Sequence, residues 1–342
     1  MVKTRSGLGL ALVQLILALS VSFLDAAGKE SAGLNYRSHG ADWPGLCQSG
    51  EKQSPVGVTT KDLKPYAKPE YAPNLETLGV AGDITFLLTT VLPHVEVEWE
   101  RLTEPARATL AATKDGDIFA PLRGDVDADE LKRVAFEPAQ FHFHTPSENS
   151  LDGNLFDGII HVVNFVKDGE SEMCDSIKAS GGLGCPVVVS IFLKEDERVE
   201  ACPLSLLSSV NVAATGEPNP SDYLIRSAGK ENGVKFFGHF DLDSILPSDG
   251  KIAIWEGSLT TAPCTEGVFW IQFLTPADVS FPEIMQLRNT LAYAAGSDCK
   301  SIKNGQCFPQ RFPSNNRMTQ PLNGRVVRTA DVYSEAKKAT SL

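Results

Sequence analysis

The chain has 342 residues, of which 42% are hydrophobic and 22% are charged, and its formal net charge is −12. This length suits one large domain or two modest ones. Because the chain is acidic and has no long basic cluster, nucleic acid is excluded as an expected partner, since phosphate binding needs a positive face. A small neutral or anionic substrate remains allowed, because such a molecule responds to the local site.

The N-terminus has the composition of a secretory signal peptide. Lys3 and Arg5 precede the apolar run Leu8–Leu24, and small residues follow at Ala26–Gly28. The apolar run is slightly long for a signal peptide and slightly short for a membrane-spanning helix. We expect residues 1–27 to be removed, although retention as an anchor stays open. The mature protein is then expected in the secretory lumen or outside the cell, with no stable membrane span.

Seven cysteines remain after the N-terminal segment, and none forms the C-x-x-C pattern of zinc or redox sites. In an oxidising compartment they are expected to form disulfides. The odd number leaves one thiol that is either free or paired with a second chain, which would give a disulfide-linked oligomer. The seven are Cys47, Cys174, Cys185, Cys202, Cys264, Cys299 and Cys307.

Strand signals outnumber helix signals along the chain. Residues 34–58 are interrupted by glycine, proline and serine and are expected to be irregular. Residues 61–80 are polar and rich in proline, and we expect them to be extended. Ile84–Leu102 contains two strand patterns divided at Pro93. Residues 103–139 are charged and are expected to form a loop-like insertion on one rim of a sheet.

The second half of the chain has longer apolar runs. Further strands are predicted in β-branched and aromatic runs at Gly158–Lys167, Val187–Glu195 and, as a pair joined by a turn, Ile252–Pro276. Residues 168–186 are expected to be a glycine-rich loop, and Phe281–Tyr293 is the one clear amphipathic helix. No repeat or linker interrupts the pattern. A single domain is therefore predicted from residue 34 to residue 329, followed by a polar tail at 330–342.

The stretch Gln140–Ser150, QFHFHTPSENS, alternates histidine with phenylalanine. Successive side chains of a β-strand point to opposite faces, so His142 and His144 share one face at a separation of about 7 Å. Phe141 and Phe143 then point into a core on the other face. On a helix the two imidazoles would point in widely different directions and could not share a ligand.

A third histidine, His161, lies within the predicted strand Gly158–Lys167. If this strand lies beside the first, three neutral imidazoles can converge on one cation. A fourth tetrahedral position is then left for water, which is the arrangement of a catalytic zinc site. The strand pattern alone leaves open that these are ordinary core histidines.

Four stretches of the sequence carry a family resemblance. In chain order they read GADWPGLCQSGEKQSPV, QFHFHTPSEN, EGSLTTAPCTEGVFW and NNRMTQPLNGR. Together they resemble the α-class carbonic anhydrases of the secreted type, over essentially the whole chain after the N-terminal segment. The resemblance implies a mostly β (α+β) single domain, with a large, mainly antiparallel twisted central sheet and a few peripheral helices.

The resemblance also implies an activity and a cofactor. The activity is carbonate dehydratase (a lyase), in which hydroxide held on Zn²⁺ attacks carbon dioxide to give bicarbonate and a proton. His142, His144 and His161 match the zinc ligands. Thr260 matches a hydroxyl that accepts a hydrogen bond from the hydroxide and donates its own to Glu148, which aims the nucleophile at the substrate.

Other positions match the substrate pocket of the family and its disulfide. The apolar wall that holds carbon dioxide matches Val163, Val188, Leu259 and Trp270, which could equally be plain core. Thr261 matches the bicarbonate edge, and Gln140 matches an amide that orients the first ligand. Cys47 and Cys264 match a disulfide that ties the N-terminal segment to the Thr260 turn. Cys299–Cys307 is a candidate local pair, and Cys174, Cys185 and Cys202 lie outside the pattern.

Two positions depart from the family. His94 is the candidate proton shuttle, since an imidazole titrates near neutrality. Its context, LPHVEV, replaces the usual Asn-Gly-His, so an ordinary surface histidine stays open. Ile159 occupies the position of a glutamate that orients the third ligand, and its side chain cannot accept a hydrogen bond. Asp157 is the nearest carboxylate to this position in the sequence.

The loss of such an orienting partner typically lowers metal affinity or activity by about 10–100-fold. We therefore expect zinc binding to survive with reduced affinity or rate. The alternative from another class is a non-catalytic or weakly active carbonic-anhydrase-like protein used for extracellular binding or matrix. The enzyme is favoured because all three ligand histidines are present. Zinc esterase activity would use the same site as a side activity.

Overall fold

The computed structural model describes residues 36–66, 68–91, 94–99, 105–124, 126–199, 234–294, 302–303, 306–307 and 314–333. The expected signal segment at 1–27, Cys202 and the Cys299–Cys307 pair fall outside the described residues in whole or in part. The predictions made for them, including a disulfide-linked oligomer, stay predictions.

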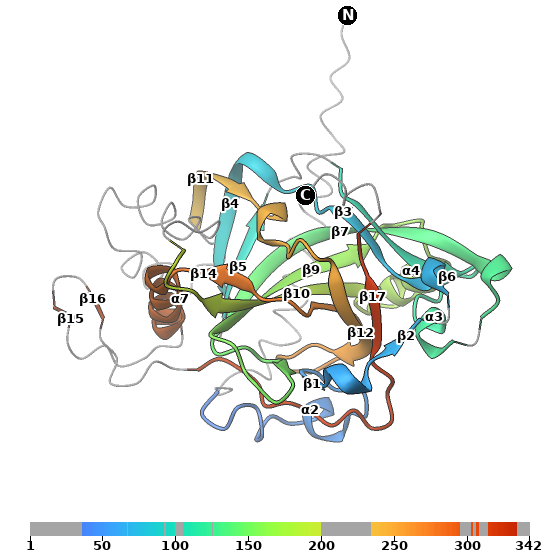
Figure 1. The fold of residues 1–342 in the computed structure, drawn as a ribbon, viewed down its shortest axis with the longest axis horizontal. Coiled ribbons are helices and arrows are strands. Elements are labelled where there is room, and N and C mark those ends of the chain that lie inside the picture. Colours follow the sequence, from blue (N-terminus) through green and yellow to red (C-terminus); the bar gives the residue numbers. More distant parts are fainter. Residues whose placement is uncertain are drawn as a thin grey trace, which may run out of the picture.

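A twisted sheet of thirteen strands forms the body of the described structure (Figure 1). Ten strands follow one another across it, in the order β11 (Val234–Asp241), β4 (Ala81–Val91), β5 (His94–Trp99), β7 (Leu131–His144), β9 (Gly158–Val166), β10 (Pro186–Glu195), β13 (Glu266–Phe273), β12 (Lys251–Ser258), β17 (Arg328–Asp331) and β2 (Lys64–Pro65). The other three are β3 (Asn74–Thr77), β6 (Arg107–Thr113) and β14 (Ala277–Val279). Neighbours are antiparallel except at β10–β13, β10–β14 and β17–β2, so the predicted mostly β, mainly antiparallel fold is confirmed.

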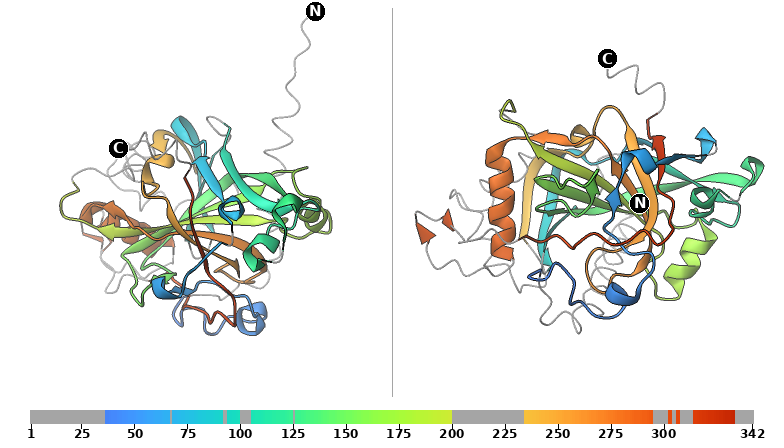
Figure 2. Two further views of the ribbon diagram at one scale, coloured as in Figure 1. Left: turned by 45° about the vertical axis from the view of Figure 1, so that its right-hand side comes forward. Right: turned by 60° about the horizontal axis from the view of Figure 1, so that its bottom comes forward.

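Short helices surround this sheet. They are α2 (Leu46–Ser49), α3 (Ala120–Arg123), α4 (Glu172–Ala179) and α7 (Phe281–Ala294), with 3₁₀ turns η1 (Thr60–Asp62), η2 (Pro69–Tyr71), η3 (Ala128–Glu130) and η5 (Asp243–Ile245). Two small ladders, β1 (Gly57–Val58) with β8 (Ser150–Leu151) and β15 (Ile302–Lys303) with β16 (Gln306–Cys307), stand apart. Figures 1 and 2 show α7 and α4 at opposite ends of the molecule. α7 confirms the predicted amphipathic helix. In the described part of the chain, no helix has the length and apolarity needed to span a membrane.

The expectation of a loop-like insertion at residues 103–139 is wrong. This region forms β6 and the first half of β7, which pair with each other. Val134 and Phe136 are buried, whereas Arg133 just before them is exposed and Ala135 between them is half-buried. The alternation of a half-exposed strand is therefore present, but the charged residues of its solvent face obscured it.

The expected glycine-rich loop at residues 168–186 contains a helix, which is a second correction. Ser171 caps α4, because its hydroxyl accepts the backbone N–H of Cys174 at 3.2 Å. Glu172 and Asp175 in the first turn favour the same helix start through the helix dipole. A capping serine followed by acidic residues was the available signal, and the glycines at 181–184 masked it.

A β-bulge in β7 exchanges the faces of the strand. The register of β7 against β9 shifts just before Gln140. Ahead of the shift Phe136 is buried in the main core, and after it Phe141 and Phe143 are. Because side chains alternate between faces, the extra residue moves the core-facing positions from even to odd numbers. Both histidines of the QFHFH stretch therefore face away from the main core.

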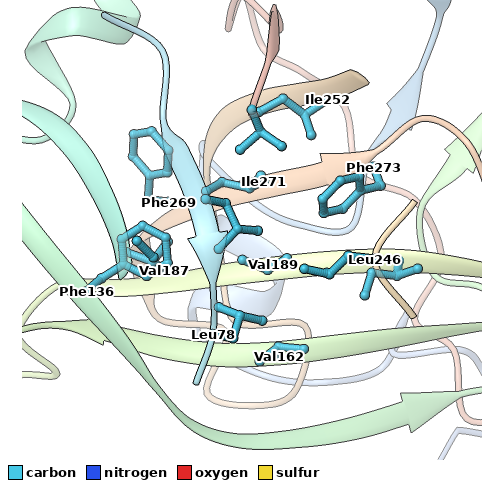
Figure 3. Close-up of a cluster of buried hydrophobic side chains, with 14 of the residues drawn as sticks. Leu78, Phe136, Val162, Val187, Val189, Leu246, Ile252, Phe269, Ile271 and Phe273 are labelled. Atoms are coloured by element: carbon cyan, nitrogen blue, oxygen red, sulfur yellow. The ribbon is translucent and has the colours of Figure 1, made fainter. Parts of the chain in front are cut away.

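The main hydrophobic core packs on one face of the central strands. Figure 3 shows part of it, with the labelled side chains Leu78, Phe136, Val162, Val187, Val189, Leu246, Ile252, Phe269, Ile271 and Phe273. The alternate residues of β9, β10 and β13 point to the opposite face, where Val163, Val188 and Trp270 belong to a smaller cluster. The candidate site lies on that second face.

Two disulfides are present among the described cysteines. Cys47–Cys264 spans 217 residues and confirms the pairing that the family resemblance implies. Cys174–Cys185 spans 11 residues and joins α4 to the chain just before β10, so two of the three unassigned cysteines pair with each other. These bonds indicate an oxidising compartment.

The two disulfides should differ in their contribution to stability. In the chain-entropy model a disulfide contributes about 3 kcal/mol for a loop of about 15 residues and nearly 5 kcal/mol for one of about 100. Cys47→Ser/Cys264→Ser should therefore lower the free energy of unfolding more than Cys174→Ser/Cys185→Ser. Urea unfolding of both double variants measures the difference, and an equal or smaller loss for the long-range bridge would contradict it.

Candidate metal centre

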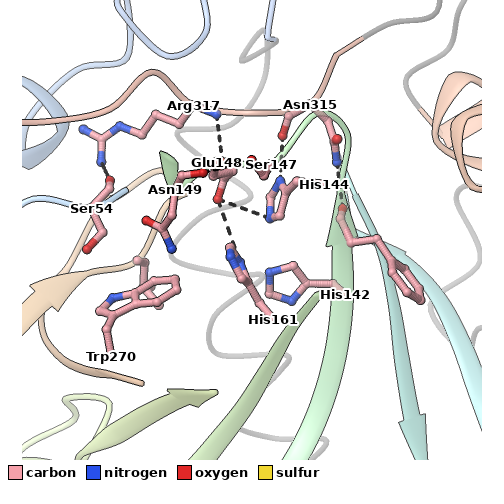
Figure 4. Close-up of polar contacts among 12 residues, drawn as sticks. Ser54, His142, His144, Ser147, Glu148, Asn149, His161, Trp270, Asn315 and Arg317 are labelled. Atoms are coloured by element: carbon pink, nitrogen blue, oxygen red, sulfur yellow. Dashed lines mark hydrogen bonds and ion pairs between the residues drawn. The ribbon is translucent and has the colours of Figure 1, made fainter. Parts of the chain in front are cut away.

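Three histidines from two neighbouring strands meet on the face away from the main core. His142 on β7 lies directly opposite His161 on β9, and His144 follows two residues along β7. The ring centroids are 5.1 Å apart for His142 and His144, 5.3 Å for His142 and His161, and 4.9 Å for His144 and His161. All three residues are buried, and one ligand nitrogen from each lies within 4.8 Å of the others. Figure 4 shows the rings pointing toward one another.

This donor set fits a zinc ion. Zn²⁺ binds imidazole nitrogen at about 2.0–2.1 Å, and three such ligands leave a fourth tetrahedral position for water or substrate. Structural zinc sites usually fill all four positions with protein ligands, so three histidines indicate a catalytic site. In the part of the chain that the structure describes, no second group of three His, Cys, Asp or Glu side chains is close enough to hold a metal.

Hydrogen bonds fix the orientation of the two β7 ligands. The Nδ1–H of His142 donates to Oε1 of Gln140 at 3.0 Å, and the Nδ1–H of His144 donates to the backbone oxygen of Asn315 at 2.6 Å. Because a carbonyl oxygen can only accept, each Nδ1 carries the proton and each Nε2 keeps the lone pair that a metal needs. Gln140 thus lies where the family resemblance placed it.

Asn315 is a site residue that the sequence reading missed. Besides its backbone contact with His144, its side-chain Oδ1 accepts the N–H of Thr145 at 2.8 Å, and its Nδ2 donates to the backbone oxygen of Phe143 at 2.9 Å. Asn315 is buried and therefore clamps the end of β7. The available signal was the NNRMTQ stretch, which was noted as a family motif without roles for its residues.

Glu148 is the buried carboxylate of the site. Its Oε1 accepts the backbone N–H of Arg317 at 2.8 Å, and its Oε2 lies 3.4 Å from Nε2 of His144 and 3.8 Å from Nδ1 of His161 (Figure 4). Burial raises the pKa of Glu148 to about 8, opposed by the Arg317 N–H, the Thr260 hydroxyl and the Arg317 charge. A cation held by the histidines would favour the ionised form of this carboxyl.

Arg317 joins Glu148 to the N-terminal segment and is also a residue that the sequence reading missed. Its guanidinium is buried and donates to Oε1 of Gln53 at 3.0 Å and to the backbone oxygens of Ser54 at 2.6 Å and Cys47 at 2.8 Å. Burial lowers the pKa of Arg317 to about 10. The side chain still carries its positive charge at neutral pH, and this charge interacts electrostatically with the Glu148 carboxyl.

Thr260 lies in the turn that follows β12 and is buried. The turn is closed by the N–H of Leu259, which donates to the oxygen of Thr265 at 2.9 Å, and by the N–H of Cys264, which donates to the oxygen of Thr261 at 2.8 Å. The disulfide at Cys264 holds the far end of the turn. Thr260 is therefore held in a segment fixed at both ends, and its hydroxyl is close enough to Glu148 to lower the pKa of that carboxyl.

The residues predicted to line an apolar wall adjoin the histidines. Val163, Val188 and Trp270 occupy neighbouring positions on β9, β10 and β13, and Leu259 packs against the same cluster. The Trp270 ring lies 4.9 Å from the His161 ring, at an interplanar angle of 81°. Trp270 is held by its Nε1–H, which donates to the backbone oxygen of Ser258 at 3.1 Å.

The sequence also pointed to His94 as a proton shuttle and to Asp157 as a carboxylate near the third ligand. His94 begins β5, and its backbone pairs with Val91, while Glu96 of the same strand lies opposite His142. A shuttle role for His94 stays a prediction. Asp157 is engaged away from the metal centre, since its Oδ2 accepts the N–H of Glu195 at 2.9 Å.

Ile159 is fully buried and lies in register with His144 on one side and Phe192 on the other. Its position on the histidine face is that of an apolar packing residue. Ile159 therefore offers no hydrogen-bond acceptor to His161, and its difference from the family stays a prediction from the sequence.

Comparison with known proteins identifies this fold and site as those of a zinc-dependent lyase family. Residues 38–331 match the eukaryotic-type carbonic anhydrase family, and the chain belongs to it. With its three histidines intact, the protein is a carbonic anhydrase whose cofactor is zinc and whose substrates are carbon dioxide and bicarbonate.

The chain is similar to carbonic anhydrase from Nostoc sp., with 28% identity over 287 residues, which cover 82% of this chain and 77% of that protein. It is 23% identical over 290 residues to carbonic anhydrase 1 of Monodelphis domestica, covering 82% of this chain and 90% of the relative. The crystal structure of a halotolerant carbonic anhydrase from Dunaliella salina has a TM-score of 0.61 at 23% identity, over 88% of this chain and 98% of that chain. This last likeness shows the shared fold.

Asn315→Ala tests the clamp at the end of β7. The variant leaves the buried N–H of Thr145 and the oxygen of Phe143 unpaired, at a cost of about 1–3 kcal/mol for each group. We expect a lower free energy of unfolding in urea and weaker zinc binding, because the His144 acceptor is displaced. Asn154→Ala, at an exposed position, is the matched control and should change stability by no more than about 0.5 kcal/mol. Wild-type zinc affinity in Asn315→Ala would contradict the clamp.

Proposed function

We propose that the chain hydrates carbon dioxide reversibly, with His142, His144 and His161 as the zinc ligands and Thr260 and Glu148 as the pair that orients the nucleophile. The observation that supports this most is the convergence of three buried imidazoles beside a buried carboxylate. A packing cluster would not need a carboxylate at its centre, because a buried charge without a partner is costly.

Zinc bound at this site supplies a water molecule whose pKa is lowered to about 7, an effect for which carbonic anhydrases are themselves the standard example. Ionised Glu148 can only accept hydrogen bonds, so the Thr260 hydroxyl donates its hydrogen bond to this carboxylate. The oxygen of Thr260 is then left to accept a hydrogen bond from the attacking water-derived group. This directs a lone pair of the nucleophile toward the substrate.

The apolar wall supplies a place for carbon dioxide. Val163, Val188, Leu259 and Trp270 offer no hydrogen-bonding side chain toward the substrate except the indole N–H, which already donates to Ser258. An uncharged, apolar molecule can therefore sit beside the metal without competing with water for hydrogen bonds. Thr261, which follows Thr260, is proposed at the edge where bicarbonate leaves.

Ile159 supports one alternative, a protein that binds zinc but is weakly active or inactive. Its side chain gives His161 no acceptor, and the loss of such a partner typically lowers metal affinity or activity by about 10–100-fold. The intact ligand set and the Thr260–Glu148 pair favour catalysis over this alternative.

Stopped-flow measurement of carbon dioxide hydration by the zinc-loaded full chain tests the proposed function. The wild type should be active and inhibited by a sulfonamide. Thr260→Val should bind zinc normally and lose about 100-fold in kcat/KM, because a misplaced nucleophile can cost about that much. Thr275→Val, an exposed threonine in the turn after β13, is the control and should keep wild-type activity.

A wild type that retains zinc after dialysis but shows no sulfonamide-sensitive hydration would support the binding protein instead. Zinc content near zero in the dialysed wild type would refute the metal site itself. Equal activity in Thr260→Val and the wild type would leave the zinc site in place and remove Thr260 from the mechanism.

We also propose that the protein enters the secretory pathway and loses residues 1–27 there. The disulfides support an oxidising compartment, and the N-terminus has signal-peptide composition. N-terminal sequencing of the protein secreted by cells that express the full chain should begin at about residue 28. A mature protein that still starts at Met1 would contradict this proposal.

A further inference from the structure

Ser190 carries a buried hydroxyl whose place in the fold calls for an explanation. The residue is fully buried in β10, and its Oγ has no hydrogen-bond partner among the described residues. Leaving a buried polar group unpaired costs about 1–3 kcal/mol. Such groups are few in native proteins and often mark a site whose partner arrives with a ligand or a metal.

The sheet places Ser190 beside the third metal ligand. In the antiparallel pair β9–β10, Ser190 lies directly opposite His161, and Val188, two residues away, lies opposite Val163. Residues that face each other in this way share one face of the sheet, with Cβ atoms about 4.5–5.5 Å apart. The side chains of Ser190 and His161 therefore lie next to each other on the metal face.

Gln272, the next residue in the same row of the sheet, already has hydrogen-bond partners for its side chain. Gln272 on β13 pairs with Ser190 on its other side. Its Nε2 donates to the backbone oxygens of Ser190 at 3.2 Å and Phe273 at 3.0 Å, and its Oε1 accepts from Nδ2 of Asn149 at 2.9 Å. Both ends of the Gln272 amide therefore already have partners, whereas the Ser190 hydroxyl has none among the described residues.

The other polar groups near His161 also have established partners. Glu148 accepts from Arg317 and lies between His144 and His161, and Asp157 accepts from the backbone of Glu195. Glu148 and Asp157 thus each accept at least one hydrogen bond, whereas the side chain of Ser190 has no hydrogen-bond partner among the described residues.

We propose that Ser190 is a positioning residue for the third zinc ligand. Its hydroxyl accepts the N–H of the His161 ring nitrogen that faces away from the metal, as Gln140 does for His142 and Asn315 does for His144. Ser190 would thus serve in place of the carboxylate that Ile159 cannot supply. The inference rests on the proposed zinc site. A hydroxyl is a weaker acceptor than a carboxylate, so some loss of affinity relative to a carboxylate remains.

Zinc affinity of the full chain, measured by competition with a chromophoric chelator, tests the proposal. Ser190→Ala should bind zinc about 10-fold or more weakly, the typical effect of losing a partner of a ligand histidine. Ser190→Thr keeps the hydroxyl and should stay within about threefold of the wild type, well short of that loss. The visible spectrum of the cobalt-substituted protein should change in the alanine variant and not in the threonine variant.

Stability of the metal-free protein separates positioning from packing. Ser190→Ala removes an unpaired hydroxyl, so its metal-free form should unfold at the same urea concentration as the wild type or a higher one. Ser171→Ala is the matched control, because Ser171 is a buried serine with two hydrogen bonds, to Gly116 and Cys174. This control should lose stability and keep its zinc affinity.

Each outcome decides the matter. Ser190→Ala with zinc affinity within about twofold of the wild type would overturn the role of Ser190 while leaving the zinc site intact, since a lost ligand partner costs about 10-fold or more. A loss of zinc affinity matched by an equal loss of metal-free stability would assign Ser190 to packing and would also overturn it. A wild type that binds no zinc would refute the proposed function and this inference together.

Discussion

The pairing of β7 with β9 is the constraint on which the metal centre depends. A strand has a side-chain period of two, so a slip of one residue would turn His142 and His144 into the main core. The register is held from the core side, where Phe141 and Phe143 are buried, each contributing about 1.5–3 kcal/mol. Apolar packing on one face therefore sets the positions of the polar ligands on the other.

The bulge before Gln140 makes this possible within a single strand. The first half of β7 needs its even-numbered residues in the core, and Phe136 is one of them. Without the extra residue the same parity would bury the histidines among aliphatic side chains. Bulges are common next to functional sites because they re-aim side chains in this way.

The sequence pattern predicted the parts of the site that depend on local geometry. Alternation in QFHFH placed two histidines on one face, and the composition around His161 indicated a second strand. The roles of Asn315 and Arg317 were not predictable in the same way, because both contact residues about 170 positions earlier in the chain. The missed strand β6 and helix α4 have another cause, since charged and glycine-rich neighbours concealed short but regular signals.

The supports of the three ligands come from different parts of the fold, and this has a consequence for how the site forms. Gln140 lies on the same strand as the ligand it orients, so its contact can form as soon as β7 is extended. The Asn315 carbonyl reaches His144 only after the C-terminal segment has crossed the end of β7. Glu148 in turn needs Arg317, whose guanidinium is held by the segment that carries Cys47.

A metal that binds only the folded arrangement stabilises that arrangement by its binding free energy. Zinc at the three histidines would therefore stabilise the docking of both terminal segments as well as the local geometry of the ligands.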